Sequence, residues 1–503
     1  MKRFIQLACF LLLPIHSLFA QTNKKIQIEN ANSLEFDESL GVKAQRLIGN
    51  VIFSHEGALM YCDSAYFFNE SNRLEAFSNV RIVSDSVTLT GNKLDYDGRE
   101  KLAVITGNVF MEDPSSTLKT DELVYDTRNK TGRYTTGGVI RSKTSNNELT
   151  SVFGNYHSSS GFFYFKKKVV LKNDNYTMYC DTLDYNSRTE VAYFKGSTRI
   201  IGENKIYCEN GYYDTQNDIS EFNEKAVLDS KGQKISAQRI FYDRKNGLGR
   251  ARDRVTIIDS TQNTIINGGY ADYDEKENRL LVTRKPLLRM EVDGDTLYLM
   301  ADTLRNISIP ETDFKKLFAY HGVRFYKTDL QGQCDSLVYS TQDSLMELFR
   351  KPVLWNDDNQ LNADSCQIRM ANGKIDKIYL VQNAFISSEI DSIRFNQIKG
   401  RKITGFFVES KLRKILVEGN GQSIYYAESD SAEYIGVNKA ECTNMVIYID
   451  SNQVSSIIFI KDPDATLYPL FEVPAKELLL RGFAWLGDLR ATRKEDITVG
   501  RLW

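Results

Sequence analysis

The stretch Thr106–Asp126, TGNVFMEDPSSTLKTDELVYD, contains the unit that recurs along most of this chain. It opens with the turn residues Gly107-Asn108 and is divided by a loop at Asp113-Pro114. Apolar residues stand at every second position, at Val109 and Met111 before the loop and at Leu123 and Tyr125 after it. A period of two is typical of a β-strand with one buried face. The stretch therefore predicts a β-hairpin.

The same pattern returns along the chain, which is the sequence sign of a repeat array. The gaps between equivalent positions are 28 to 32 residues, with one longer gap of 37. In such an array each unit buries its apolar face against its neighbours, so the chain can be long without forming many globular domains. The equivalents of Val109 are Val51, Val80, Val139, Val169, Thr198, Ala226, Val255, Pro286, Val323, Pro352 and Ala384.

Within each unit the apolar phase slips by one residue near a polar position of the return strand. In four units this position is Asp63, Asn92, Asp121 or Asp181. A slip of this kind turns a strand inside out unless a bulge or bend absorbs it. We therefore expect each return strand to bend around a corner and to contribute to two sheets, which gives a tall, V-shaped jelly roll. A helical array is disfavoured, because β-branched and aromatic residues dominate and helical spacing is missing.

The first twenty residues combine a basic start with an apolar run. Met1-Lys2-Arg3 precedes the apolar Phe4–Ala20, a pattern typical of a cleaved secretory signal peptide. An uncleaved amino-terminal membrane anchor is the alternative. The run is short and is interrupted by Gln6, Pro14 and His16, which favours cleavage.

The repeat spacing divides the chain into five parts. We expect a signal peptide at 1–20, jelly-roll repeats at 21–306 and 318–417, an irregular insertion at 307–317, and terminal closing strands with a short helix and a tail at 418–503. The helix is expected within Ala475–Asp488, whose apolar residues on or near one face are Leu478, Leu479, Phe483 and Leu486.

Charge and motifs exclude several classes of function. With 64 basic and 66 acidic residues the net charge is −2, which gives no electrostatic reason to bind nucleic acid. No nucleophile elbow, phosphate loop or dinucleotide fingerprint occurs in the sequence. No Cys-x-x-Cys or histidine pair supplies metal-ligand spacing. We therefore expect a protein that is not an enzyme and that holds no cofactor or metal.

Carboxylates recur at one repeat position, at Asp63, Asp121, Asp181 and Asp335. Stacked carboxylates could form the acidic ladder of a polysaccharide-active β-solenoid enzyme. The same position is Asn92 or Glu209 in other units, which suits the capping of a corner better.

Six cysteines remain after the leader: Cys62, Cys180, Cys208, Cys334, Cys366 and Cys442. An even number in an exported protein invites disulfides. However, several share one repeat position, and equivalent residues of neighbouring units lie about 9–10 Å apart. Bridged Cα atoms need about 4.4–6.8 Å. We expect these cysteines to be small buried apolar residues.

The recurring text resembles the OstA-like family, which includes LptA, LptC and the periplasmic part of LptD. The residues that carry the resemblance are Gly49-Asn50-Val51-Ile52-Phe53 and Gly107-Asn108-Val109-Phe110, each followed by a return strand of the form A/T-D-x-L-x-Y-D. It covers roughly Gly41–Val417. It implies an all-β fold, an elongated twisted β-jelly roll of stacked hairpins. This chain departs from the family's short members in having about twelve units.

The resemblance also implies a function and a location. Members carry lipopolysaccharide across the periplasm with its acyl chains inside the groove, and they join other Lpt-type envelope proteins through edge strands. For this chain it implies a periplasmic, non-catalytic transport bridge, with association with the outer membrane as a further expectation. A single long chain could then do what a filament of short proteins does.

The inward slots of the repeats are the candidate lipid-binding positions. Plain core packing is the alternative role for each of them. Two other functions stay open: a structural scaffold of envelope assembly with a filled core, and the polysaccharide-active enzyme. The groove-lining candidates are Val51, Phe53, Val80, Ile82, Leu94, Val109, Met111, Leu123, Val169, Leu171 and Leu183.

Overall fold

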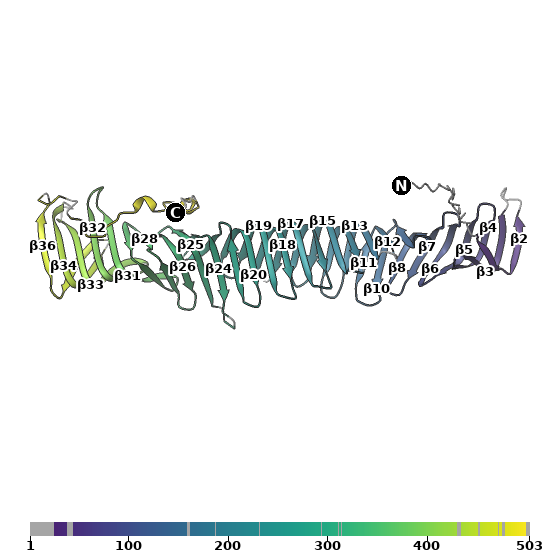
Figure 1. The fold of residues 1–503 in the computed structure, drawn as a ribbon, viewed down its shortest axis with the longest axis horizontal. Coiled ribbons are helices and arrows are strands. Elements are labelled where there is room, and N and C mark those ends of the chain that lie inside the picture. Colours follow the sequence, from purple (N-terminus) through teal and green to yellow (C-terminus); the bar gives the residue numbers. More distant parts are fainter. Residues whose placement is uncertain are drawn as a thin grey trace, which may run out of the picture. The chain divides into compact units, whose positions relative to one another are not determined.

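The computed structural model describes residues 25–498, apart from 38–43, 158–160, 187, 231, 293, 310, 313, 430–433, 451–452, 471 and 475–477. The expected signal peptide, residues 1–20, lies outside the described residues. The chain forms two compact units, residues 1–174 (unit 1) and 175–503 (unit 2). Nearly every element is a β-strand paired with its neighbours (Figure 1), which confirms the all-β fold of stacked hairpins. None of the described residues belongs to a helix long and apolar enough to cross a membrane.

Unit 1 is a succession of antiparallel hairpins. From β3 to β8 each strand pairs with the next one in the sequence. Near Val139 the strands split in two, so that β8 pairs with both β9 and β10, and β13 with both β11 and β12. The strands are β1 (Gln27–Asn30), β2 (Ser33–Asp37), β3 (Ala44–His55), β4 (Ala58–Phe68), β5 (Arg73–Ser84), β6 (Val87–Asp97), β7 (Leu102–Glu112), β8 (Ser116–Asp126), β9 (Thr131–Tyr134), β10 (Gly138–Ser142), β11 (Glu148–Ser151), β12 (Phe153–His157) and β13 (Phe162–Lys172).

Unit 2 repeats the same arrangement. The strands are β14 (Thr177–Asn186), β15 (Val191–Ile201), β16 (Lys205–Asp214), β17 (Ile219–Ser230), β18 (Gln233–Asp243), β19 (Leu248–Asp259), β20 (Thr264–Asp274), β21 (Arg279–Thr283), β22 (Leu287–Val292), β23 (Asp295–Met300), β24 (Thr303–Ser308), β25 (Lys315–Lys327), β26 (Leu330–Ser340), β27 (Leu345–Phe349), β28 (Val353–Asn356), β29 (Asn359–Asn362), β30 (Ser365–Ala371), β31 (Lys374–Glu389), β32 (Phe395–Val408), β33 (Lys411–Glu428), β34 (Tyr434–Asp450), β35 (Gln453–Ile460) and β36 (Asp464–Pro469). Within the segment 307–317, expected to be irregular, Ile307 and Ser308 end β24 and Lys315–Leu317 begin β25.

Each hairpin bends at a corner, and the outgoing strand carries the extra residue. In the first hairpin, Gly49-Asn50 of β3 lies opposite the single residue Asp63 of β4. Both residues of the pair have positive φ, +77° and +46°, a region that Gly and Asn tolerate best. The sequence pattern places the bend in the return strand, whereas the structure shows a bulge in the outgoing strand that bends both.

The same pair of positive φ values recurs at the corners of both units. Because a two-residue bulge opposes one residue each time, the sheet turns at the same height in every hairpin. The recurring pairs are Ser78-Asn79, Gly107-Asn108, Lys167-Lys168, Glu224-Lys225, Asp253-Arg254, Arg284-Lys285, His321-Gly322, Arg350-Lys351, Gln382-Asn383, Gly419-Asn420 and Lys461-Asp462.

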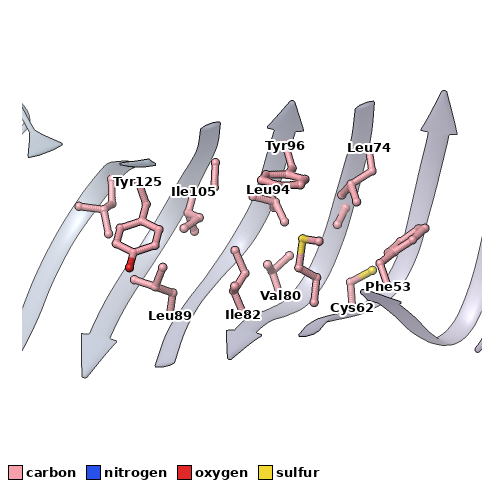
Figure 2. Close-up of a cluster of buried hydrophobic side chains, with 14 of the residues drawn as sticks. Phe53, Cys62, Leu74, Val80, Ile82, Leu89, Leu94, Tyr96, Ile105 and Tyr125 are labelled. Carbon is pink, nitrogen blue, oxygen red and sulfur yellow. The ribbon is translucent and has the colours of Figure 1, made fainter. Parts of the chain in front are cut away.

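The core of unit 1 lies between the two half-sheets that meet at the corner. Figure 2 shows inward side chains of successive strands, including Phe53, Ile82, Leu94 and Tyr96, gathered in one layer. Alternate side chains of each strand point into this layer, as a period of two requires. The buried cluster extends from Ile26 to Tyr134.

The helix expected within Ala475–Asp488 is wrong for the described residues. Leu478 has 3₁₀ conformation, residues 481–482 form a turn, and the 3₁₀ turns η3 (Gly487–Leu489) and η4 (Lys494–Ile497) follow, with no α-helix among the described residues of this segment. The physical reason is that Leu478 and Leu480, two positions apart, both enter a cluster with Phe385 and Ile424. Two of its backbone groups, the carbonyl of Leu478 and the N–H of Leu480, bond to the side chain of Gln397 in the sheet.

Candidate functional site

The predicted lining residues lie on the inner faces of the strands. All of them except Leu171 are at most 4% exposed, and Leu171 is half-buried. Eight of them belong to the single core cluster of unit 1, whereas Val169 and Leu171 lie on β13 and Leu183 lies in unit 2. The eight are Val51, Phe53, Val80, Ile82, Leu94, Val109, Met111 and Leu123.

The inner face of unit 1 carries an unbroken apolar row. Directly paired residues across β1, β3, β4 and the following strands down to β13 are all apolar. Paired residues of neighbouring strands share a face of the sheet, so this row is one continuous apolar strip. Its members are Ile28, Phe53, Met60, Ile82, Leu89, Met111, Leu118, Ile140, Leu149 and Leu171.

The interior is packed with side chains in this structure. Two hollows of the described surface lie at the corner and not between the half-sheets. One surrounds Phe110, Lys119 and Asp121, and the other surrounds Tyr193 and Tyr212. A ligand would therefore have to part the two half-sheets in order to reach the apolar strip.

Opposite the corner, the strands of the two half-sheets of unit 1 end in turns, and these two rows of turns meet along a line that we call the seam. One edge holds the turns after β3, β5 and β7, and the other holds the turns after β4, β6 and β8. Lys101 Nζ lies 2.5 Å from Glu56 Oε2 across this line. Lys130 pairs with Asp85 in the same way one repeat further on. The backbone N–H of Ile26 donates to Asn72 Oδ1 at 2.9 Å.

Two tyrosines, the buried Tyr96 and the partly buried Tyr156, also reach across the seam. His55 Nδ1 and the hydroxyl of Tyr96 are 2.6 Å apart, and the hydroxyl of Tyr156 donates to Asp113 Oδ2 at 3.3 Å. Burial, and then the charge of Asp113, raise the pKa of Tyr156 well above its ordinary value. Burial also raises the pKa of Tyr96. Both phenols therefore stay neutral at physiological pH.

Unit 2 has a corresponding contact between its own edges. Lys315, at the start of β25, lies 3.4 Å from Asp259, at the end of β19. Burial acts to raise the pKa of Asp259, but the hydrogen bond from Thr261 and the charge of Lys315 outweigh it, and the net pKa is lowered. Asp259 is therefore ionised in the folded protein at neutral pH.

The recurrent corner carboxylates bond to residues of the corner itself. Asn79 Nδ2 donates to Asp63 Oδ2 at 2.8 Å, and Asp335 accepts from Arg350 at 3.2 Å. These contacts favour the capping interpretation over an acidic catalytic ladder. Among the described residues no cluster of three or more His, Cys, Asp or Glu has the proximity of a metal site.

All six cysteines of the described chain are buried and free. Their predicted role as small buried residues is thereby confirmed. Burial raises the pKa of the Cys62 thiol to about 11 and that of Cys180 to about 12. The thiolate, the reactive form, is correspondingly scarce at neutral pH.

A row of buried glutamines, which the sequence pattern did not indicate, lies on the outer face of unit 2. Gln360 donates to the carbonyl of Ala484 at 2.7 Å and accepts from the N–H of Leu486 at 2.7 Å. Gln397 holds the carbonyl of Leu478 and the N–H of Leu480 in the same way, at 3.0 and 2.8 Å.

A third glutamine, Gln331, accepts from Arg490 Nε at 2.8 Å. The segment 478–498 is thus fixed across the outside of the sheet. The signal in the sequence was the uninterrupted apolar run Val353-Leu354-Trp355, which is typical of a strand covered on both faces. In the structure every residue of this strand, β28, is buried.

Comparison with known proteins finds a similarity to one family in the amino-terminal part. The model of the OstA-like protein family matches residues 23–181 and 164–238. Residues 23–238 of this chain are therefore OstA-like, and the resemblance read from the repeat text is confirmed for this part. The comparison with curated proteins found no match.

Among solved structures, the chain is similar to LptH of Pseudomonas aeruginosa. That protein is described as the LptA-homologous periplasmic component of the conserved lipopolysaccharide transport device. The sequence identity is 11% and the TM-score is 0.20, and the match covers 21% of this chain and 79% of that chain.

Proposed function

We propose that this chain is a periplasmic lipopolysaccharide-binding bridge of outer-membrane assembly that carries acyl chains between its half-sheets without catalysis. The observation that carries the proposal is the continuous apolar row of unit 1 within an OstA-like sequence. Such a strip offers apolar contacts to a hydrocarbon chain and no hydrogen-bond partners to a polar group. Each buried methylene contributes about 0.8 kcal/mol, whereas a buried polar headgroup without partners would be costly.

Loading requires that the lipid replace side-chain contacts now made across the interior. At the corner the half-sheets are joined by the covalent backbone of each strand, whereas at the seam they are joined by side chains. Parting therefore begins at the seam, with the headgroup remaining in water outside it.

The expected partners are other Lpt-type envelope proteins that add a strand to an exposed sheet edge. In unit 1, β2 pairs with β3 and carries Leu34 and Phe36, which are 54% and 56% exposed. Exposed apolar side chains on an edge strand suit the addition of a partner strand. The expected location is the periplasm, in contact with the outer membrane.

A structural scaffold of envelope assembly is the second candidate, and the packed interior favours it. A core whose lining residues have almost no exposed surface gives stability without any ligand. In this alternative the stack only holds partner proteins at a distance.

Photo-crosslinking in cells separates the two candidates. A benzophenone amino acid is placed at the inward positions Phe53 and Leu171, and at the outward neighbours Ile52 and Val170 as matched controls. A carrier gives lipopolysaccharide adducts at the inward positions and few at the outward ones. Equal labelling of both faces, or no lipid adduct together with normal lipopolysaccharide export after depletion, would contradict the proposal and favour the scaffold.

A further inference from the structure

The contacts across the seam of unit 1 follow a fixed spacing in the sequence. Glu56–Lys101 and Asp85–Lys130 are each 45 residues apart, Ile26–Asn72 is 46 and Asp113–Tyr156 is 43. The spacing is the sum of the length of one repeat and the length of the return strand of a hairpin. In the two ion pairs the turn of one half-sheet meets a turn of the other half-sheet one repeat further on.

Two of these contacts are ion pairs at the outer side of the seam, next to solvent. The Glu56 and Lys101 side chains are partly buried, and Asp85 and Lys130 are more exposed. Ion pairs in such positions are weak one by one and are screened by salt. The corner, in contrast, is crossed by the covalent backbone of each strand, with paired residues on both sides of the bulge. The seam is therefore the weaker of the two sides.

The inner ends of the same contacts close the apolar strip. His55 and Tyr96 lie just inside the ion pairs, on the inner faces of β3 and β6, and meet across the seam. An acyl chain that enters from the side must pass between the paired charges and then between these two rings. The contacts named here that close this path among the described residues are made by side chains.

We propose that the seam of unit 1 is a lateral entrance for acyl chains, and that the Glu56–Lys101 and Asp85–Lys130 pairs are its latches. This inference rests on the proposed lipid-carrying function and adds the route and its control. The latches break and re-form as a lipid passes, while the corner acts as the hinge. The static alternative is that the ion pairs only stabilise a core that never opens.

A cleavable crosslink across the seam tests the entrance. The full chain carries the substitutions Glu56→Cys and Lys101→Cys, joined by a bifunctional maleimide with a reducible spacer. The buried thiols of the native chain do not compete, because burial raises their pKa values. The matched control joins Arg73→Cys to Asp95→Cys, an ion pair of 2.9 Å between neighbouring strands of one half-sheet.

The measurement is the rate at which N-phenylnaphthylamine, and then purified lipid A, enters the protein. We expect the seam crosslink to slow uptake about tenfold or more and reduction of the spacer to restore it, with the control crosslink having no effect. Uptake unchanged by the seam crosslink would overturn the entrance but leave the carrier function standing. Absence of uptake in every form would overturn the carrier function, and the entrance with it.

Charge variants test the latches separately. Glu56→Gln with Asp85→Asn removes both ion pairs, and we expect uptake to become severalfold faster and insensitive to salt. The exchanged variant Glu56→Lys with Lys101→Glu restores one pair and should return the rate toward that of the original chain. Equal rates in the original chain and in the Glu56→Gln, Asp85→Asn variant would show that the pairs are static, and would overturn the latch.

Discussion

His55 Nδ1 lies 2.6 Å from the hydroxyl oxygen of Tyr96, and the two side chains, 3% and 2% exposed, face each other from different half-sheets of unit 1. The residues are 41 positions apart in the sequence. Their rings are also in edge contact, with centroids 5.6 Å apart. This contact therefore joins the two half-sheets at the inner side of the seam.

Removal of that hydrogen bond should destabilise unit 1. In Tyr96→Phe the ring of His55 loses a buried partner, which costs about 1–3 kcal/mol. Urea unfolding followed by circular dichroism measures the change. The control is Tyr164→Phe, the same change at an exposed tyrosine of the same unit. Equal stability of Tyr96→Phe and this control would show that the seam contact contributes nothing.

The glutamine contacts should set the local stability of the segment 478–498. Gln397→Leu leaves the N–H of Leu480 and the carbonyl of Leu478 without their side-chain partner. Protection of the Leu480 amide against hydrogen exchange should fall about tenfold to a hundredfold. Gln422→Leu is the control, because that amide bonds the exposed side chain of Glu441. Unchanged exchange at Leu480 would contradict the assignment.

The corner glycines should differ in their tolerance of a side chain. Gly107 and Gly137 both have positive φ, so alanine costs about 1 kcal/mol at either position. At Gly107 a Cβ would also lie 2.8 Å from Asn92 Nδ2, whereas nothing lies within 4 Å at Gly137. We expect Gly107→Ala to lower the thermal midpoint several degrees more than Gly137→Ala. The reverse order would mean that the corner packs differently.

The native thiols should be unreactive. Burial raises the pKa of Cys208 and Cys334 to about 12, and that of Cys62 to about 11. At pH 8 the folded chain should not react with Ellman's reagent within an hour. The unfolded chain should react at every cysteine, measured as the absorbance of the released thiolate. The surface variant Glu56→Cys serves as the positive control. Rapid reaction of the native thiols would refute their burial.

Stability should fall at alkaline pH. Since the folded-state pKa of these thiols lies above the unfolded value of 9.0, the folded state keeps its protons where the unfolded state has lost them. The free energy of unfolding is therefore fully retained below about pH 9 and decreases as pH rises toward 11 or 12. Buried tyrosines such as Tyr134, with a pKa raised to about 12, act in the same direction. Denaturant midpoints at pH 7.5 and 10.5 measure the loss, and a higher midpoint at pH 10.5 would disprove it.

Much of the architecture could be predicted because it is local. The period of two in Val109 and Met111, and the spacing of the repeat, follow from which face of each strand is buried. The phase slip beside Asp63 located the corner, although it did not show which strand carries the extra residue. That choice depends on two positive φ values in Gly49-Asn50, which apolar patterning does not record.

The sequence by itself determined that this chain is a stack of bent hairpins with an apolar inner face, because a strand's side chains alternate whatever its neighbours are. Only the tertiary structure decided which edges meet. Glu56 pairs with Lys101, and Gln360 bonds to the backbone of Ala484. The partners are far apart in the sequence, and no short-range pattern indicates them. The same holds for 478–486, where packing against Phe385 and Ile424 overrode a helical pattern of leucines.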